Sequence, residues 1–242
     1  MINIFLLKIL SISIVFSFNN NFSLVDSLYD NRLTHEAFLQ INSLYKKYPN
    51  DIDVLFRLAR SHLDKAEQEL DLEIQKSYYY KGFEYAKKAI SVDPQSGYAN
   101  FWYAALIGKI GELEGGQQRI VNSYEVKKYG MKAVELEPAF DGCHHLMGRW
   151  HFELANLSWV ERSMARIIYG VPPQGSLDSA ILFFKEAIRI DSNQIRHHYW
   201  LARTYYAMGN YKLAEDEFKI VLSLDALDNN DKILQEDSKR YF

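Results

Sequence analysis

Three observations in the sequence predict an all-α solenoid, in which antiparallel helix pairs stack one on the next. The chain has 242 residues, of which 48% are apolar, and this is enough to bury a sizeable core. It contains only 12 Gly and 5 Pro, which favours helices over a turn-rich sandwich or barrel. A helix-ending pattern also recurs at intervals of 45, 44, 54 and 34 residues, as expected of a repeat architecture with insertions.

The clearest copy of the repeat lies near the C-terminus. It reads HxxLAxxY from residue 198, GNY from residue 209 and AxxxF from residue 214. This pattern resembles the tetratricopeptide repeat, in which large and small residues of helix A pack against an Ala and an aromatic residue of helix B. The same helix-B ending recurs, and its copies span residues 44–49, 89–94, 133–138 and 187–191. Where Pro follows an acidic residue, it stops helix B and fixes the turn into the next repeat.

The first two insertions lengthen the repeats. Residues 65–77 alternate in charge and have a helix-favouring composition, so we expect them to extend helix A. Four glycines between residues 108 and 116 follow a helical pattern rather than a strand, which indicates a flexible helix end instead of a phosphate-binding loop. Residues 231–242 are predicted to form a terminal capping helix.

The third insertion has apolar residues at helical spacing and is closed by a Gly and two Pro. We expect an extra amphipathic helix over residues 154–169, formed around Leu157, Val160, Met164, Ile167 and Ile168. Such a helix either packs on the array or lies on a membrane surface, with two arginines, at 162 and 166, on its polar side. Packing on the array is the expected arrangement.

Three short stretches around this insertion carry a family resemblance. They are GRW from residue 148, LSWxE from residue 157 and YGxP from residue 169, and they resemble the regulator of microtubule dynamics family. The resemblance covers residues 142–242 well and is weaker before them. It implies a tetratricopeptide-like helical domain and a link to microtubules, to mitochondria and to membrane tethering with a phospholipid held by the repeats.

The N-terminus has the composition of an export signal. One cation lies in residues 1–8, and an apolar run follows over residues 9–18. We expect residues 1–23 to be a signal peptide or an uncleaved membrane anchor, followed by the repeat domain over residues 24–242. A cleaved signal predicts an exported, periplasmic or secreted protein, whereas an intact one predicts a membrane-anchored protein. Export would separate the chain from tubulin.

Repeat spacing also predicts a ligand-binding groove, because positions 2, 5, 9 and 12 of each helix A line the inner face of a stacked array. We count the repeats from Ile52, Tyr98, Asp141 and Ile195. Position 5 then carries an aromatic ladder: Phe56, Trp102, His145 and Tyr199. Positions 9 and 12 add cations and further rings: Arg60, Lys109, Arg149, Phe152, Arg203 and Tyr206.

Such a face suits a ligand that bears a carboxylate or phosphate together with an apolar part. The alternative is that the arginines pair with acids of neighbouring helices, for which Glu153 and Asp64 are the candidates. The sequence therefore favours a non-catalytic scaffold that binds a protein or peptide. A phospholipid-binding or membrane-tethering module, associated with microtubules as the resemblance implies, is the alternative function.

Other function classes have little support in the sequence. The net charge of −3 gives no overall attraction to nucleic acid, and the repeats are too few and irregular to read RNA. Cys143 is the only cysteine, and the histidines lack the spacing of a helical metal site. No nucleophile with a base, catalytic carboxylate pair or dinucleotide fingerprint is apparent. We therefore predict no catalytic residues, no metal and no cofactor.

Overall fold

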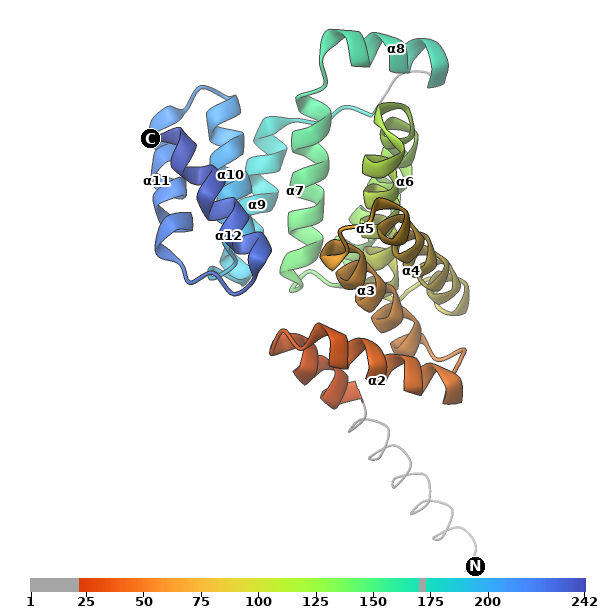
Figure 1. Ribbon diagram of the computed structural model, residues 1–242. Coiled ribbons are helices and arrows are strands. Elements are labelled where there is room, and N and C mark those ends of the chain that lie inside the picture. The colour runs from red at the N-terminus through yellow and green to blue at the C-terminus, as the bar shows by residue number, and fades with distance from the viewer. Residues whose placement is uncertain (1–21, 170–172) are drawn as a thin grey trace, which may run out of the picture. The chain divides into compact units, whose positions relative to one another are not determined.

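The computed structural model describes residues 22–169 and 173–242, and every regular element in these ranges is a helix. The prediction of an all-α fold is therefore confirmed. The chain forms two compact units, which meet in the sequence between Val92 and Asp93 and are described separately (Figure 1). The predicted signal or anchor at residues 1–23 lies outside the described residues except for its last two, which are helical.

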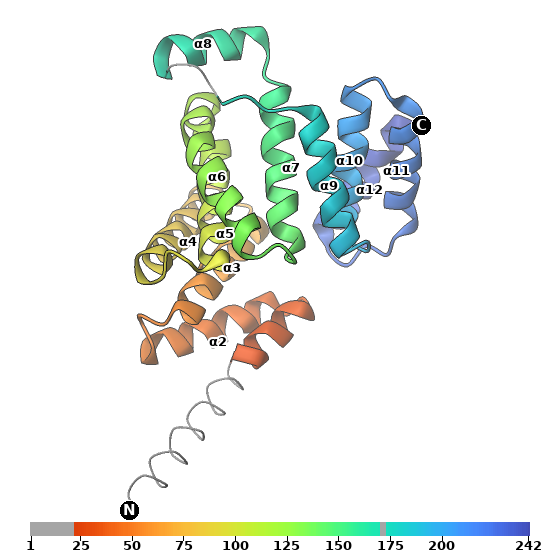
Figure 2. The same ribbon diagram turned by 180° about the vertical axis from the view of Figure 1, so that it is seen from behind.

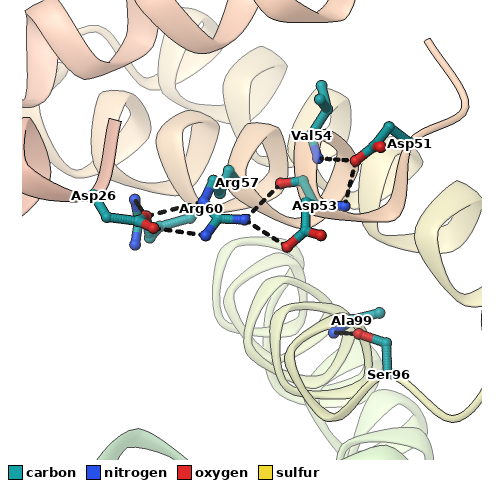
Figure 3. Close-up of polar contacts among 8 residues, drawn as sticks. All are labelled: Asp26, Asp51, Asp53, Val54, Arg57, Arg60, Ser96 and Ala99. Atoms are coloured by element: carbon teal, nitrogen blue, oxygen red, sulfur yellow. Dashed lines mark hydrogen bonds and ion pairs between the residues drawn. The ribbon is translucent and has the colours of Figure 1, made fainter. Parts of the chain in front are cut away.

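Unit 1 consists of two helix pairs. Residues 22–30 are helical and precede α2 (Thr34–Lys47), and α3 (Ile52–Gln68) pairs with α4 (Leu72–Val92). Helix α3 begins at Ile52 because the Asp51 carboxylate accepts hydrogen bonds from the main-chain N–H groups of Asp53 and Val54 (Figure 3). The core of the unit is apolar and comprises Phe22, Val25, Ile41, Leu44, Val54 and Leu58.

The prediction for residues 65–77 is wrong in part. Helix α3 stops at Gln68, and the last part of this insertion, from Leu72, already belongs to α4. The Asp71 carboxylate accepts hydrogen bonds from the first main-chain N–H groups of α4, so the break has its own cap. The insertion thus lengthens both helices of the pair.

Unit 2 contains three helix pairs and a cap. The pairs are α5 (Gly97–Glu114) with α6 (Gly116–Leu136), α7 (Asp141–Ala155) with α9 (Leu177–Ile190), and α10 (Ile195–Ala207) with α11 (Tyr211–Ser223). They follow one another side by side (Figure 2). Three of the four predicted repeat starts coincide with helix starts, and α5 begins one residue before the predicted Tyr98.

The predicted C-terminal cap is confirmed. Helix α12 (Asn229–Ser238) and a 3-10 turn (Lys239–Tyr241) pack on α10 and α11. The ring of Tyr241 stacks on that of Phe218, with centroids 4.2 Å apart, and Phe218 is fully buried. Burying one such aromatic side chain contributes about 1.5–3 kcal/mol. The cap therefore closes the apolar end that the last helix pair would otherwise expose.

Glycine has two different roles between α5 and α6. Gly111 lies inside α5, and a Cβ at this position would stand 3.0 Å from the main chain of Arg119, so it permits close approach of the two helices. Gly115 ends α5 with a φ of 95°, in the region where glycine is favoured. The turn between the two long helices is thus confined to Gly115, and the expectation of a helix end holds there alone.

The third insertion forms the predicted extra helix, but over a shorter range. Helix α7 continues to Ala155, and α8 runs over Trp159–Tyr169. A capping box starts α8, because the Ser158 hydroxyl accepts from the main-chain N–H of Glu161, whose carboxylate accepts from the N–H of Ser158. Within residues 22–169 and 173–242, neither α8 nor any other helix has the length and apolar composition needed to span a bilayer.

Candidate functional site

The predicted inner face divides between the two units. In unit 2 its residues lie on α5, α7 and α10, the first helices of the three pairs. In unit 1 only Phe56 and Arg60, both on α3, belong to it, and they are treated by themselves below. Unit 2 therefore contains eight of the predicted groove residues: Trp102, Lys109, His145, Arg149, Phe152, Tyr199, Arg203 and Tyr206.

The aromatic ladder of unit 2 is mostly buried. Trp102, Phe152 and Tyr199 are 8%, 7% and 4% exposed. Phe152 meets the ring of Trp200 edge-on, with centroids 5.3 Å apart, so α7 and α10 are joined by aromatic packing. These rings stabilise the contacts between helices, and a ligand reaches only the residues that remain partly exposed around them.

Arg149 of α7 is the best-defined accessible cation. Its guanidinium carbon lies 3.7 Å from the ring centroid of Trp200, which is half-buried. Its Nη2 lies 3.4 Å from a carboxylate oxygen of Glu112 and 3.3 Å from one of Glu153. The expected pairing with Glu153 is thus present, but at long distances and with both carboxylates partly exposed.

Arg203 of α10 lies on the same side of the unit. Its guanidinium carbon is 5.5 Å from the Trp200 centroid, so that ring contacts two guanidinium groups. Its Nη1 donates to the Tyr199 hydroxyl at 2.9 Å, and this hydroxyl donates to Asp237 of the cap at 2.6 Å. Burial and the hydrogen bond to Asp237 raise the pKa of Tyr199 to about 12. Arg203 is therefore held in place by a neutral phenol.

The two remaining predicted residues lie at the edges of this face. Lys109 of α5 is 3.9 Å from Glu112, which makes a weak, partly exposed ion pair. Tyr206 is 46% exposed and touches the rings of Tyr211 and Tyr241. The inner face thus carries three cations, Lys109, Arg149 and Arg203, but it also carries acids, so it is less positive than the spacing alone indicated.

His145 is half-buried and belongs to a polar network that joins α7 and α10. Its Nδ1 lies 2.9 Å from Nδ1 of His197, whose Nε2 lies 2.9 Å from an Asp141 oxygen. The same oxygen accepts from Arg196 at 2.8 Å. Burial would raise the pKa of Asp141, but the hydrogen bond from His197 and the charge of Arg196 lower it to about 2. Burial lowers the pKa of both histidines, so each is neutral.

In unit 1, Arg60 is bound by other residues of the same unit. Its Nη2 lies 3.2 Å from Asp26, and its guanidinium carbon lies 3.7 Å from the ring centroid of Tyr29. Asp26 also accepts two hydrogen bonds from Arg57, at 2.9 and 2.6 Å (Figure 3). Phe56 is 7% exposed and packs in the unit. The ion pair of Arg60 is therefore with Asp26, not with the expected Asp64.

Trp200 and Glu112 are the two residues of this face that sequence reasoning missed. Trp200 falls at position 6 of its repeat, which is not one of the positions 2, 5, 9 and 12 predicted to line the groove. Its ring nevertheless contacts Arg149 and Arg203, which both lie at position 9. The signal that points to it is the Tyr-Trp pair at the start of α10, since adjacent helix residues diverge by about 100° and one ring must leave the core.

The fold and this face define a tetratricopeptide-repeat-like protein. A thermophilic tetratricopeptide protein of Thermus thermophilus superposes with a TM-score of 0.66 at 15% identity, over 92% of this chain and 98% of that one. PilF of Pseudomonas aeruginosa gives 0.53 at 14% identity, over 92% and 87%. The predicted helical solenoid is thereby confirmed. More particularly, the chain belongs to the family Regulator of microtubule dynamics protein 1-3, whose sequence pattern matches residues 22–241.

Individual relatives agree with this assignment. Regulator of microtubule dynamics protein 1 of Bos taurus is 33% identical over 202 residues, which is 83% of this chain. Regulator of microtubule dynamics protein 3 of Xenopus laevis is 31% identical over 186 residues, or 76% of this chain. The matched regions make up 63% and 40% of those two proteins, so the chain corresponds to only part of each. The resemblance predicted from residues 142–242 is confirmed and extends to both units.

Proposed function

We propose that this chain is a non-catalytic scaffold, which binds a protein or peptide segment on the inner face of unit 2. The observation that carries the proposal is that Trp200 lies beside the guanidinium groups of both Arg149 and Arg203, 3.7 and 5.5 Å from its ring centroid. A half-buried ring beside two cations offers both an apolar contact and charged donors. This combination suits a peptide with an acidic side chain next to an apolar or aromatic one.

The weak internal ion pairs of this face support the proposal. Arg149 contacts Glu112 and Glu153 at 3.3 Å or more, and all three side chains are partly exposed. Pairs of this kind contribute about 0–1 kcal/mol, so a ligand carboxylate can replace them at little cost. By contrast, Arg60 of unit 1 is nearly enclosed and bound to Asp26 and Tyr29, and we assign it a structural role.

The names of the relatives suggest a partner for this scaffold. Regulator of microtubule dynamics protein 1 is named for microtubules. We propose association with microtubules as the first interaction to examine. Co-sedimentation of the full chain with stabilised microtubules at increasing salt measures it. Binding that is lost in the double variant Arg149→Ala/Arg203→Ala places the contact on the inner face, and binding that the variant retains places it elsewhere.

A peptide selection tests the scaffold directly. Peptides from a displayed random library are selected on the full chain, and the affinity of those recovered is measured by calorimetry. We expect acidic peptides with an apolar residue, and we expect Arg149→Ala/Arg203→Ala to lower their affinity by about tenfold or more. The matched control is Arg189→Ala, which removes an exposed cation from α9 that pairs with Glu186.

Two outcomes would overturn the proposal. Equal peptide affinity in the wild type and the double arginine variant would remove the inner face from binding. Native mass spectrometry of the purified chain gives the second outcome, because a co-purified phospholipid that blocks peptide binding would make the repeats a lipid-binding module. A far-ultraviolet circular dichroism spectrum like that of the wild type shows that each variant is folded.

A further inference from the structure

Helix α8 presents an apolar outer surface in unit 2. Trp159, Val160 and Ile167 are 80%, 56% and 84% exposed, although apolar residues of an amphipathic helix normally face the core. Ala165 is 1% exposed and marks the side on which α8 packs. The expectation that Val160 and Ile167 pack on the array is therefore wrong. Three large apolar side chains together on one short helix indicate an interaction surface.

The charge beside this surface is positive. At about 100° per residue, Arg166 falls next to Trp159 on the outer side of α8. Arg166 is exposed, and it has no acidic partner among the residues that the structure describes. Glu161 turns toward α6, where it lies 3.3 Å from Arg119, and Arg162 donates to a main-chain carbonyl of α7. We call Trp159, Val160, Arg166 and Ile167 the α8 surface.

We propose that the α8 surface docks on an anionic lipid bilayer, with the helix lying in the plane of the membrane. In this orientation Trp159 and Ile167 enter the boundary between headgroups and acyl chains. Arg166 then reaches a lipid phosphate, which supplies the anionic partner that the described residues do not provide. The proposal concerns a surface other than the inner face, so it goes beyond the scaffold function.

The size of the α8 surface favours a bilayer over a protein partner. Its three apolar side chains expose on the order of 400 Å², about half of the roughly 800 Å² that each partner contributes to a standard protein interface. A membrane needs no such closed, complementary area, because insertion energy grows with each side chain that enters it. A second copy of the chain or a protein groove is therefore the less favoured occupant.

A second exposed apolar patch lies at the same end of unit 2. The α10–α11 turn exposes Met208, Tyr211 and Leu213 by 38%, 63% and 47%. Figures 1 and 2 both show this turn and α8 at one end of the unit, with α7 and α9 between them. A bilayer is flat and extended, so it offers contacts to apolar patches on more than one helix at the same end of the unit. The arrangement of the two patches therefore agrees with membrane docking.

The test follows Trp159 itself, because residues 2–18 are mainly apolar, carry Lys8 as their single charge and can bind vesicles without α8. The full chain is titrated with vesicles of phosphatidylcholine alone or with phosphatidylserine at about 30% of the lipid, with and without brominated acyl chains. We expect a blue shift and bromine quenching of the emission with the anionic vesicles. Trp102 and Trp150 are buried and Trp200 is half-buried, whereas Trp159 is 80% exposed. Trp159→Phe should therefore remove most of both signals.

Two variants probe the docking contacts while they keep Trp159 as the reporter. Ile167→Ser should raise the lipid concentration for half-maximal quenching by about tenfold. Arg166→Gln should raise it by about fivefold, with a weaker dependence on salt. Leu182→Ser is the matched control, because it removes a 69% exposed apolar residue from α9, and its titration should follow the wild type.

Unchanged Trp159 emission on vesicle-bound chain would overturn the proposal, since the chain would then be held by another segment. Equal quenching in the wild type and Ile167→Ser would do the same. Light scattering gives a further outcome. A dimer that Ile167→Ser converts to a monomer would show that a second copy covers the α8 surface, and this too would overturn it. Peptide affinity on the inner face is expected to stay unchanged in Ile167→Ser, which separates this proposal from the scaffold function.

Discussion

Arg149 of α7 stacks on Trp200 of α10, with 3.7 Å between the guanidinium carbon and the ring centroid. The same guanidinium keeps its edge toward Glu112 and Glu153. Only a planar cation can use its face for a ring and its edge for carboxylates at the same time. Neighbouring repeats are thus joined by an interaction that a lysine cannot reproduce, and one that remains partly open to a ligand.

Arg149→Lys should accordingly lower the free energy of unfolding by about 0.5–1 kcal/mol, because the ammonium keeps the charge and loses the stacking. Arg149→Ala should cost about 1–2 kcal/mol, since it also removes both carboxylate contacts. Urea denaturation followed by circular dichroism measures both changes. Arg189→Lys on α9 is the control and should stay within about 0.5 kcal/mol of the wild type. Equal stability of the wild type and Arg149→Lys would show that stacking contributes nothing.

Gly148 of α7 lies against Phe184 of α9, and a Cβ at this position would be 2.6 Å from the ring. Phe184 is fully buried and has no room to move away. Gly148→Ala should therefore destabilise the protein by about 1–3 kcal/mol, even though alanine favours the helix. Gly116→Ala is the matched control, because a Cβ there meets no atom within 4 Å. Its stability should be unchanged or slightly higher, and a similar loss in both variants would contradict the steric explanation.

Local signals explain what the sequence predicted well. Helices α3, α7 and α10 begin at Ile52, Asp141 and Ile195 as predicted from the repeat spacing. For α3 the signal is local, because the Asp51 side chain caps the helix. The family resemblance also rested on short contiguous stretches, and the whole-chain match confirms it.

Long-range packing explains what the sequence did not predict. The Tyr199 hydroxyl donates to Asp237, which is 38 residues away, and spacing within one repeat carries no information about that contact. The exposure of Ile167 depends on how α8 meets α6, whereas its apolar spacing is the same for a packed helix. The break between α3 and α4 was also not predicted. Residues on both sides of this short turn favour helix, so composition alone does not reveal the turn.

Asp64 of α3 should make stability fall with rising pH. Burial raises its pKa to about 7, although the nearby charge of Arg60 acts in the opposite direction. Between about pH 4 and pH 7 the folded state therefore holds a proton that the unfolded state has lost, so deprotonation destabilises the fold. Asp64→Asn should be more stable than the wild type by about 1–2 kcal/mol at about pH 8, with the difference vanishing near pH 4. Urea denaturation at several pH values measures this, and parallel curves for the two proteins would refute it.

The network of His145, His197 and Asp141 in unit 2 should have the opposite effect, so that the stability of the fold rises with pH. Burial lowers the pKa of both histidines, so below about pH 6.5 the unfolded state binds protons that the folded state does not. The pKa of Asp141 is lowered to about 2, so its contribution is present above about pH 4 and is lost only as the pH falls toward 2. The network therefore stabilises unit 2 fully at neutral pH and progressively less in acid.

His197→Gln isolates this effect, because glutamine keeps a donor for Asp141 and cannot take up a proton near neutral pH. At about pH 7.5 we expect the variant to be less stable than the wild type by about 1–3 kcal/mol, through imperfect hydrogen bonding in a buried site. Between about pH 6.5 and pH 5 its stability should fall less steeply than that of the wild type, so the two curves converge. Combining it with Asp64→Asn removes the opposing contribution of unit 1 and makes the comparison cleaner. Curves that keep a constant separation from about pH 7.5 to pH 5 would show that His197 carries no proton-linked stability.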